Sequence, residues 1–278
     1  MTVSSTGSST GSSIETSTGS STVFSTVLRS EWTKFRTIRA TGYVLAGAFV
    51  TALFYGFLFG TANGRAYLGA SAEDQASFDP VVTAFRGLFL AQLLVSATGV
   101  LAVTSEYASG TMRTSATVVP RRGRLLAGKA ALVALILLPC GPLIALGSFL
   151  ISQATLTAQD VPSVTLTDPG VPGAIVGAGL YLTLIGLYGV AMGFLIRRTA
   201  GATALGSFLL LLPAMASLFP DWLARWVLTY WPTAAGMTLF TPSPVTDALP
   251  PSLGFTVLAT TVLALLLAAL TLFRSRDI

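Results

Sequence analysis

The sequence contains no histidine and only one cysteine, Cys140, among its 278 residues. Without histidine the chain cannot form a Ser-His-Asp or Cys-His catalytic arrangement, and haem binding and nearly all zinc chemistry are excluded as well. A single cysteine allows no disulfide within the chain and no cluster of thiolates around a metal. We therefore expect no catalytic site, no cofactor and no metal site.

Charged residues are also scarce, since they make up 10% of the chain while hydrophobic residues make up 53%. Soluble domains carry about 25% charged residues, so a soluble fold is disfavoured. The basic pI of 9.7 would suggest nucleic-acid binding in a soluble protein. Here the positive charge lies in short stretches beside apolar segments, where it orients helices and meets anionic lipid. We expect membrane lipids as partners and no nucleic acid.

Six apolar segments contain no Asp, Glu, Lys or Arg. Each supplies the roughly 20 residues that a helix rising about 1.5 Å per residue needs to cross about 30 Å of hydrocarbon. We therefore predict an all-α membrane protein with six transmembrane helices in residues 40–278. The segments are 40–62, 87–105, 130–159, 169–196, 199–220 and 248–273.

Positive charge alternates between the two sides of these segments. Thirteen of the 16 Lys and Arg residues lie before the first segment, between the second and third, between the fourth and fifth, and after the sixth. The opposite connections hold three cations against seven acids. Because positively charged connections stay in the cytoplasm, we predict that both the N-terminus and the C-terminus are cytoplasmic.

The chain ahead of the first segment divides into two parts. Residues 1–22 are almost wholly Ser, Thr and Gly, which cannot bury enough apolar surface to fold, and we predict a disordered tail. Residues 23–39 combine cations with apolar residues at steps of three and four, which predicts an amphipathic helix at the cytoplasmic membrane surface. A simple extension of the first span is the alternative. The apolar residues are Phe24, Val27, Leu28, Trp32, Phe35 and Ile38.

Two further patterns lie in and between the spans. Three glycine pairs spaced four residues apart favour close helix packing, more simply within one bundle than between copies. Residues 220–251 gather Trp222, Trp226, Tyr230 and Trp231, which indicates an aromatic belt at headgroup level. A short helix that dips into the outer leaflet and lines the exit of a pathway is the second interpretation. The glycine pairs are Gly56 and Gly60, Gly173 and Gly177, and Gly189 and Gly193.

The connection 104–129 has a distinctive order of residues. Glu106 ends the second apolar segment, Gly110 permits a sharp reversal, and Thr111 can cap a short helix. Pro120 would stop that helix before a basic patch. We predict a short cytoplasmic helix joined rigidly to two spans, which a partner protein can push.

One apparent nucleotide-binding motif lies in the same connection. Gly123, Gly128 and Lys129 have the spacing of a phosphate-binding loop, Gly-x4-Gly-Lys. However, Ala130 stands where a Ser or Thr must ligate magnesium, and no strand precedes the motif. We interpret the match as coincidence, so this chain hydrolyses no nucleotide and any energy must come from another subunit.

The connection 104–129, with its Glu-x3-Gly-Thr core, resembles the connection between the second and third spans in permease subunits of ABC-2 type ATP-driven transporters, particularly actinobacterial ones. Residues 29–39 also resemble the segment that precedes the first span in that family. The resemblance implies a six-span exporter subunit of the bacterial plasma membrane, moving an unknown drug, lipid or peptide. Its partners would be a second permease copy, as a homodimer or heterodimer, and a cytoplasmic ABC ATPase subunit.

The resemblance also implies which residues couple the two kinds of subunit. In this family the short helix after the second span docks in a groove of the ATPase, and the amphipathic helix touches both the ATPase and the membrane. For Glu106 a simpler interpretation is an ion pair with Arg113 or a contact with a neighbouring helix end. The implied coupling residues are Glu106, Gly110, Thr111 and Arg113, together with Glu31, Trp32, Lys34 and Arg36.

Two other functions stay open at this point. A secondary transporter would need ionisable groups at mid-bilayer, but the spans contain no Asp, Glu or His, and Gln92 and Cys140 are a poor substitute. A membrane scaffold or immunity protein that does not transport would need no such groups. Because the spans show no obvious polar pathway, the sequence does not decide against this second alternative.

Overall fold

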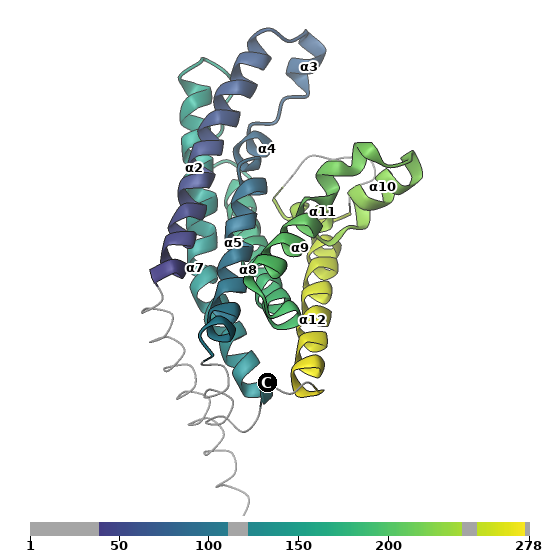
Figure 1. Cartoon of the computed structure of the whole chain (residues 1–278). Coiled ribbons are helices and arrows are strands. Elements are labelled where there is room, and N and C mark those ends of the chain that lie inside the picture. Colours follow the sequence, from purple (N-terminus) through teal and green to yellow (C-terminus); the bar gives the residue numbers. More distant parts are fainter. Residues whose placement is uncertain (1–38, 111–121, 241–248, 276–278) are drawn as a thin grey trace, which may run out of the picture.

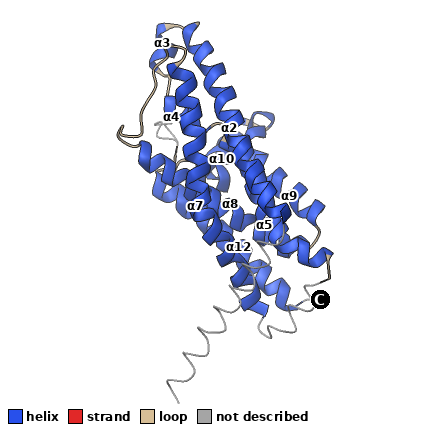
Figure 2. Ribbon diagram, turned by 90° about the vertical axis from the view of Figure 1, so that its left-hand side faces the viewer, coloured by secondary structure: helices blue, strands red, loops and turns tan. Residues whose placement is uncertain are grey.

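The structure is a computed structural model that describes residues 39–110, 122–240 and 249–275. Within these residues the chain is helical and contains no strand (Figures 1 and 2). The predicted tail 1–22, the predicted amphipathic helix 23–39 up to residue 38, and the predicted short helix that starts at Thr111 lie outside the described residues.

The described residues contain six helical spans that are long and apolar enough to cross a membrane, which confirms the predicted number and the all-α class. The second and fifth spans each consist of two helical pieces, and three short helices lie in the connections. The spans are α2 (Arg39–Leu68), α4 (Pro80–Phe85) with α5 (Leu88–Ala108), α7 (Arg122–Thr157), α8 (Val171–Ile196), α9 (Thr199–Leu211) with η1 (Leu212–Leu218), and α12 (Pro251–Ser275). The short helices are α3 (Ala72–Ala76), α10 (Asp221–Tyr230) and α11 (Pro232–Met237).

Several helices extend beyond the charge-free segments. The helix α2 continues past Arg65 to Leu68, and α7 begins at Arg122, well before the charge-free stretch that starts at residue 130. A charged side chain does not end a helix, because Arg and Lys are good helix formers. Charge therefore marks where the hydrocarbon ends and not where the helix ends.

The helix α8 forms the centre of the bundle. It packs against α5, α7 and α12 (Figure 1). In α8 72% of the membrane-spanning apolar stretch is buried within the protein, whereas the buried share of the corresponding stretch is only 22% in α2 and in α12. The outer helices instead expose large apolar side chains, among them Val50, Phe54 and Phe57 on α2. In a membrane-spanning chain such side chains face lipid, so this exposure is compatible with the predicted spans.

Glycines allow the central helices to approach closely. A Cβ added to Gly189 of α8 would lie 2.1 Å from the Ser96 carbonyl oxygen of α5, and one added to Gly60 of α2 would lie 2.1 Å from Thr155 Oγ1 of α7. These distances are below van der Waals contact, so a larger residue would have to displace the backbone of α5 at Gly189 and the Thr155 side chain at Gly60. The glycine pattern thus serves packing within the chain at these positions, while Gly173 has open space around its Cα.

Replacing Gly189 by alanine should lower stability, whereas Gly173→Ala on the same helix should not. The added methyl group at Gly189 meets backbone atoms of α5, and overpacking of this kind costs about 1 to 3 kcal/mol. Thermal unfolding of the purified protein in detergent, followed by circular dichroism, measures the difference. Equal melting temperatures for the two variants would show that α5 and α8 are not in close contact.

Candidate functional site

The last turn of α5 carries a buried carboxylate. Glu106 is only 4% exposed, and its Oε1 lies 2.9 Å from Nζ of Lys129 on α7, which is 3% exposed. Lys129 Nζ also donates a hydrogen bond of 3.1 Å to the carbonyl oxygen of Ala102. Charges this deeply buried require partners, since an isolated one would be strongly unfavourable. The pair therefore joins the end of α5 to the first turns of α7.

This ion pair lies next to the connection that the sequence singles out. Glu106 stands four residues before Gly110, the last described residue ahead of the connection. Lys129 stands seven residues after Arg122, where α7 begins. The two helices that enter and leave the connection 111–121 are thus held together immediately beside it.

A second set of polar contacts joins the same end of α5 to the turn between α8 and α9. Thr199 Oγ1 at the start of α9 donates to Thr104 Oγ1 over 2.9 Å. The guanidinium carbon of Arg197 lies 5.6 Å from the centroid of the Tyr107 ring, a cation–π contact. We call these six residues the polar cluster. They are Thr104, Glu106, Tyr107, Lys129, Arg197 and Thr199.

The structure places two of the eight predicted coupling residues. Glu106 is buried in the polar cluster, which rules out a merely solvated surface charge. Gly110 is exposed and has φ 73°, a left-handed conformation that ends helices and favours glycine, as the expected reversal requires. The other six, Thr111, Arg113, Glu31, Trp32, Lys34 and Arg36, lie outside the described residues.

Sequence reasoning missed Lys129 as the partner of Glu106. The signal was present, because Lys129 follows the buried Leu125 and Leu126 by four and three residues and so lies on the same face of α7. Residues 123–130 are α-helical, so their amides are not arranged as a phosphate-binding loop. The interpretation of the Gly-x4-Gly-Lys spacing as coincidence agrees with this geometry.

The polar cluster has the composition of a structural joint. Among the residues that the structure describes, no group of three or more His, Cys, Asp or Glu side chains comes together to hold a metal. The single cysteine of the sequence, Cys140, has a free thiol and is partly buried near the middle of α7. The described side chains of the cluster can fix helices to one another, and this mechanical role is the one that their arrangement supports.

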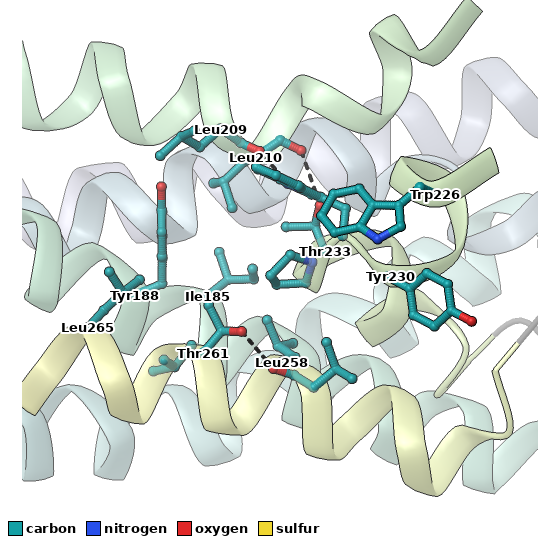
Figure 3. Close-up of a pocket in the computed structure, with 14 residues that line it drawn as sticks. Ile185, Tyr188, Leu209, Leu210, Trp226, Tyr230, Thr233, Leu258, Thr261 and Leu265 are labelled. Atoms are coloured by element: carbon teal, nitrogen blue, oxygen red, sulfur yellow. Dashed lines mark hydrogen bonds between the residues drawn. The ribbon is translucent and has the colours of Figure 1, made fainter. Parts of the chain in front are cut away.

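The opposite end of the bundle contains a pocket of about 400 Å³ between α8, α9, α12 and the short helices α10 and α11 (Figure 3). The aromatic residues Trp226, Tyr230 and Trp231 form part of its wall. Residues 221–230 do form a short helix, as one of the two interpretations of this region required.

No model of a protein family matches the chain, and no curated protein matches it in sequence.

Loss of one partner of the ion pair should be more damaging than loss of both. Glu106→Ala or Lys129→Met leaves a buried charge uncompensated, which costs about 3 to 5 kcal/mol. The double variant removes both charges and should regain much of that loss. Arg124→Met on the same helix, whose side chain is only partly buried, serves as the control and should change little. If the decrease in melting temperature of the double variant in detergent equalled the sum of the two single decreases, this would contradict a coupled pair.

Proposed function

We propose that this chain is the membrane-embedded permease subunit of an ATP-driven exporter of the ABC-2 type in a bacterial plasma membrane. A separate cytoplasmic ABC ATPase would hydrolyse ATP, and this chain, paired with a second permease copy, would move the substrate. The observation that carries the proposal is the buried ion pair of Glu106 and Lys129, which holds the helices on either side of the connection 111–121. A connection that is pushed by a partner needs such an ion pair, because the two helices at its ends must then move together.

In the proposed mechanism the ATPase acts on the chain by contact alone. Closure of two ATPase subunits pushes the connection, in which Gly110, Thr111 and Arg113 would form the contact surface, with Glu31, Trp32, Lys34 and Arg36 beside them. The ion pair passes this displacement to α5 and α7 together, and both helices pack on α8. Packed helices have discrete arrangements and shift as rigid bodies, so the push would change the bundle between two access states.

The proposed orientation places the polar cluster in the cytoplasm. The connection beside the cluster carries most of its charge as cations, while the opposite end carries acids such as Glu73, Asp74 and Asp221 on α3 and α10. Positively charged connections are retained on the cytoplasmic side of bacterial membranes. The termini would then also be cytoplasmic, since they flank an even number of spans.

Cysteine labelling can test this orientation directly. In a Cys140→Ser background, a cysteine at the exposed Ala108 should react with a membrane-impermeant maleimide only after the cells are permeabilised. A cysteine at the exposed Asp74 on α3 should react in intact cells. The reverse pattern, or labelling of both positions from outside, would contradict the orientation.

A secondary transporter receives less support from the same structure. Gln92, a polar residue inside the second span, is hydrogen-bonded within the chain at both amide atoms, because its Nε2 donates to the Phe89 carbonyl oxygen over 2.9 Å and its Oε1 accepts a hydrogen bond from the Tyr181 hydroxyl. The buried charges Glu106 and Lys129 lie in the polar cluster, at the end of the spans, and neutralise each other. Ion-driven carriers need binding groups near mid-bilayer.

Exchanging the two charges separates a structural joint from direct docking. Glu106→Lys and Lys129→Glu alone place like charges together, so each should abolish ATP-dependent transport by the permease reconstituted with its ATPase. The double exchange restores an ion pair and should recover most of the activity. Transport that stays absent in a well-folded double variant would indicate that Glu106 itself contacts the ATPase.

Purification from native membranes tests whether the chain has an ATPase as its partner. Under gentle detergent conditions the permease should retain a soluble ATPase with a complete phosphate-binding loop, in equal numbers of copies. Reconstituted vesicles should then accumulate substrate only with ATP. A chain that purifies without any ATPase would instead favour the scaffold or immunity function, and transport that needs an ion gradient but no ATP would favour the secondary transporter.

A further inference from the structure

Among the residues that the structure describes, the interior of the pocket near α10 offers a ligand no side-chain donor that is not already hydrogen-bonded within the chain. The Tyr188 hydroxyl donates to the Gly206 carbonyl oxygen over 3.1 Å, the Trp231 indole nitrogen to Leu209 over 2.9 Å, and Thr261 Oγ1 to Val257 over 2.8 Å. Thr233 Oγ1 likewise lies 3.4 Å from the Leu210 carbonyl oxygen. The rest of the described lining is Ile, Leu, Val and Pro, apart from the aromatic rim, and it includes no charged residue.

A ligand that carried a carboxylate, phosphate or carbonyl into this interior would lose its hydration without gaining a partner. That loss costs several kcal/mol for a charged group and about 1 to 3 kcal/mol for a neutral polar group. The interior therefore selects hydrocarbon. Its volume of about 400 Å³ lies within the range of pockets that hold small ligands.

The walls of the pocket also form part of the lipid-facing surface. Beside the lining residues, α9 exposes Leu205 and Phe208, and α12 exposes Leu263 and Leu267, each about half exposed. The pocket is partly open, and in a membrane-spanning chain these exposed apolar side chains beside it would face the hydrocarbon of the membrane. An empty pocket would forfeit dispersion contacts along all its walls, which favours a bound chain over a void.

The rim of the pocket has the chemistry of a membrane interface. Trp226 is 49% exposed and Tyr230 is 51% exposed, with ring centroids 6.5 Å apart. Such rings prefer the headgroup level, where one end is apolar and the polar tip is hydrated. Figure 3 shows both rings at one end of the pocket, with Tyr188 and Leu265 at the other.

From these observations we infer that the pocket binds one acyl chain of a membrane phospholipid. The chain enters between α9 and α12, its end lies toward Tyr188 and Leu265, and its headgroup side lies at Trp226 and Tyr230. The binding is selected by shape, since an acyl chain gains little from leaving one hydrocarbon environment for another. This inference does not depend on the proposed transport function.

Photolabelling tests the inference on the whole chain reconstituted in phosphatidylcholine vesicles. A trace of phosphatidylcholine with a diazirine in the middle of one acyl chain is activated by light, and mass spectrometry locates the labelled residues. We expect labelling of residues 257–265 and 226–233 to exceed that of the exposed face of α2 severalfold. Thr261→Phe fills the pocket and should reduce the label severalfold, whereas the neighbouring, exposed Thr260→Phe should not.

A second pair of variants guards against misfolding of the first. Leu265→Phe also fills the pocket, and Leu267→Phe on the lipid-facing side is its control. Equal labelling of filled and control variants, or labelling no stronger than on α2, would mean contact with surrounding lipid only and would overturn the inference. Absence of label together with crosslinks between two copies of the chain would overturn it as well. The double variant of Glu106→Ala with Lys129→Met removes both charges of the distant ion pair and should leave the labelling unchanged, so failure of the transport proposal would be seen separately.

Discussion

The buried ion pair between Glu106 and Lys129 is the contact on which the arrangement of the polar end depends. Two charges cannot be buried separately at this depth, so α5 and α7 must meet in the register that brings carboxylate and ammonium together. That register positions the ends of the connection 111–121, and the neighbouring contact of Thr104 with Thr199 extends the same joint to α9. Replacing the pair with apolar residues could preserve stability, but it would remove the requirement for this one alignment of the helices.

The helix α8 packs near the polar cluster and also lines the apolar pocket. Toward the polar end, Gly193 packs closely on Val103 of α5, while Ile185 and Tyr188 form a wall of the apolar pocket. Because the glycine contacts leave no space between α5 and α8, a shift of one helix requires the other to move or to slide along it. The polar cluster and the pocket therefore share a rigid element, although their chemistry is opposite.

Much of the fold follows from local properties of the sequence. Apolar length gives all six spans, and the glycine pairs at Gly56 and Gly189 give close contacts, because both signals are carried by neighbouring residues. Lys129 could have been placed on the buried face of α7 from its spacing to Leu125, but its pairing with Glu106 depends on how two helices align. The sequence indicates an aromatic region and offers a short helix there as one interpretation, but it does not predict the pocket itself. The walls of the pocket depend on how α8 to α12 pack together, and its apolar interior results from hydrogen bonds such as that of Trp231 with Leu209.

The unusual length of α7 has a mechanical consequence. Its 36 residues correspond to about 54 Å of helix, compared with about 30 Å of hydrocarbon in a membrane. The part from Arg122 to Lys129, about 12 Å long, therefore forms a lever arm beyond the charge-free stretch. This arm is shorter than the remaining roughly 42 Å of the helix, so a small sideways movement at Arg122 would become a larger movement at the far end of α7.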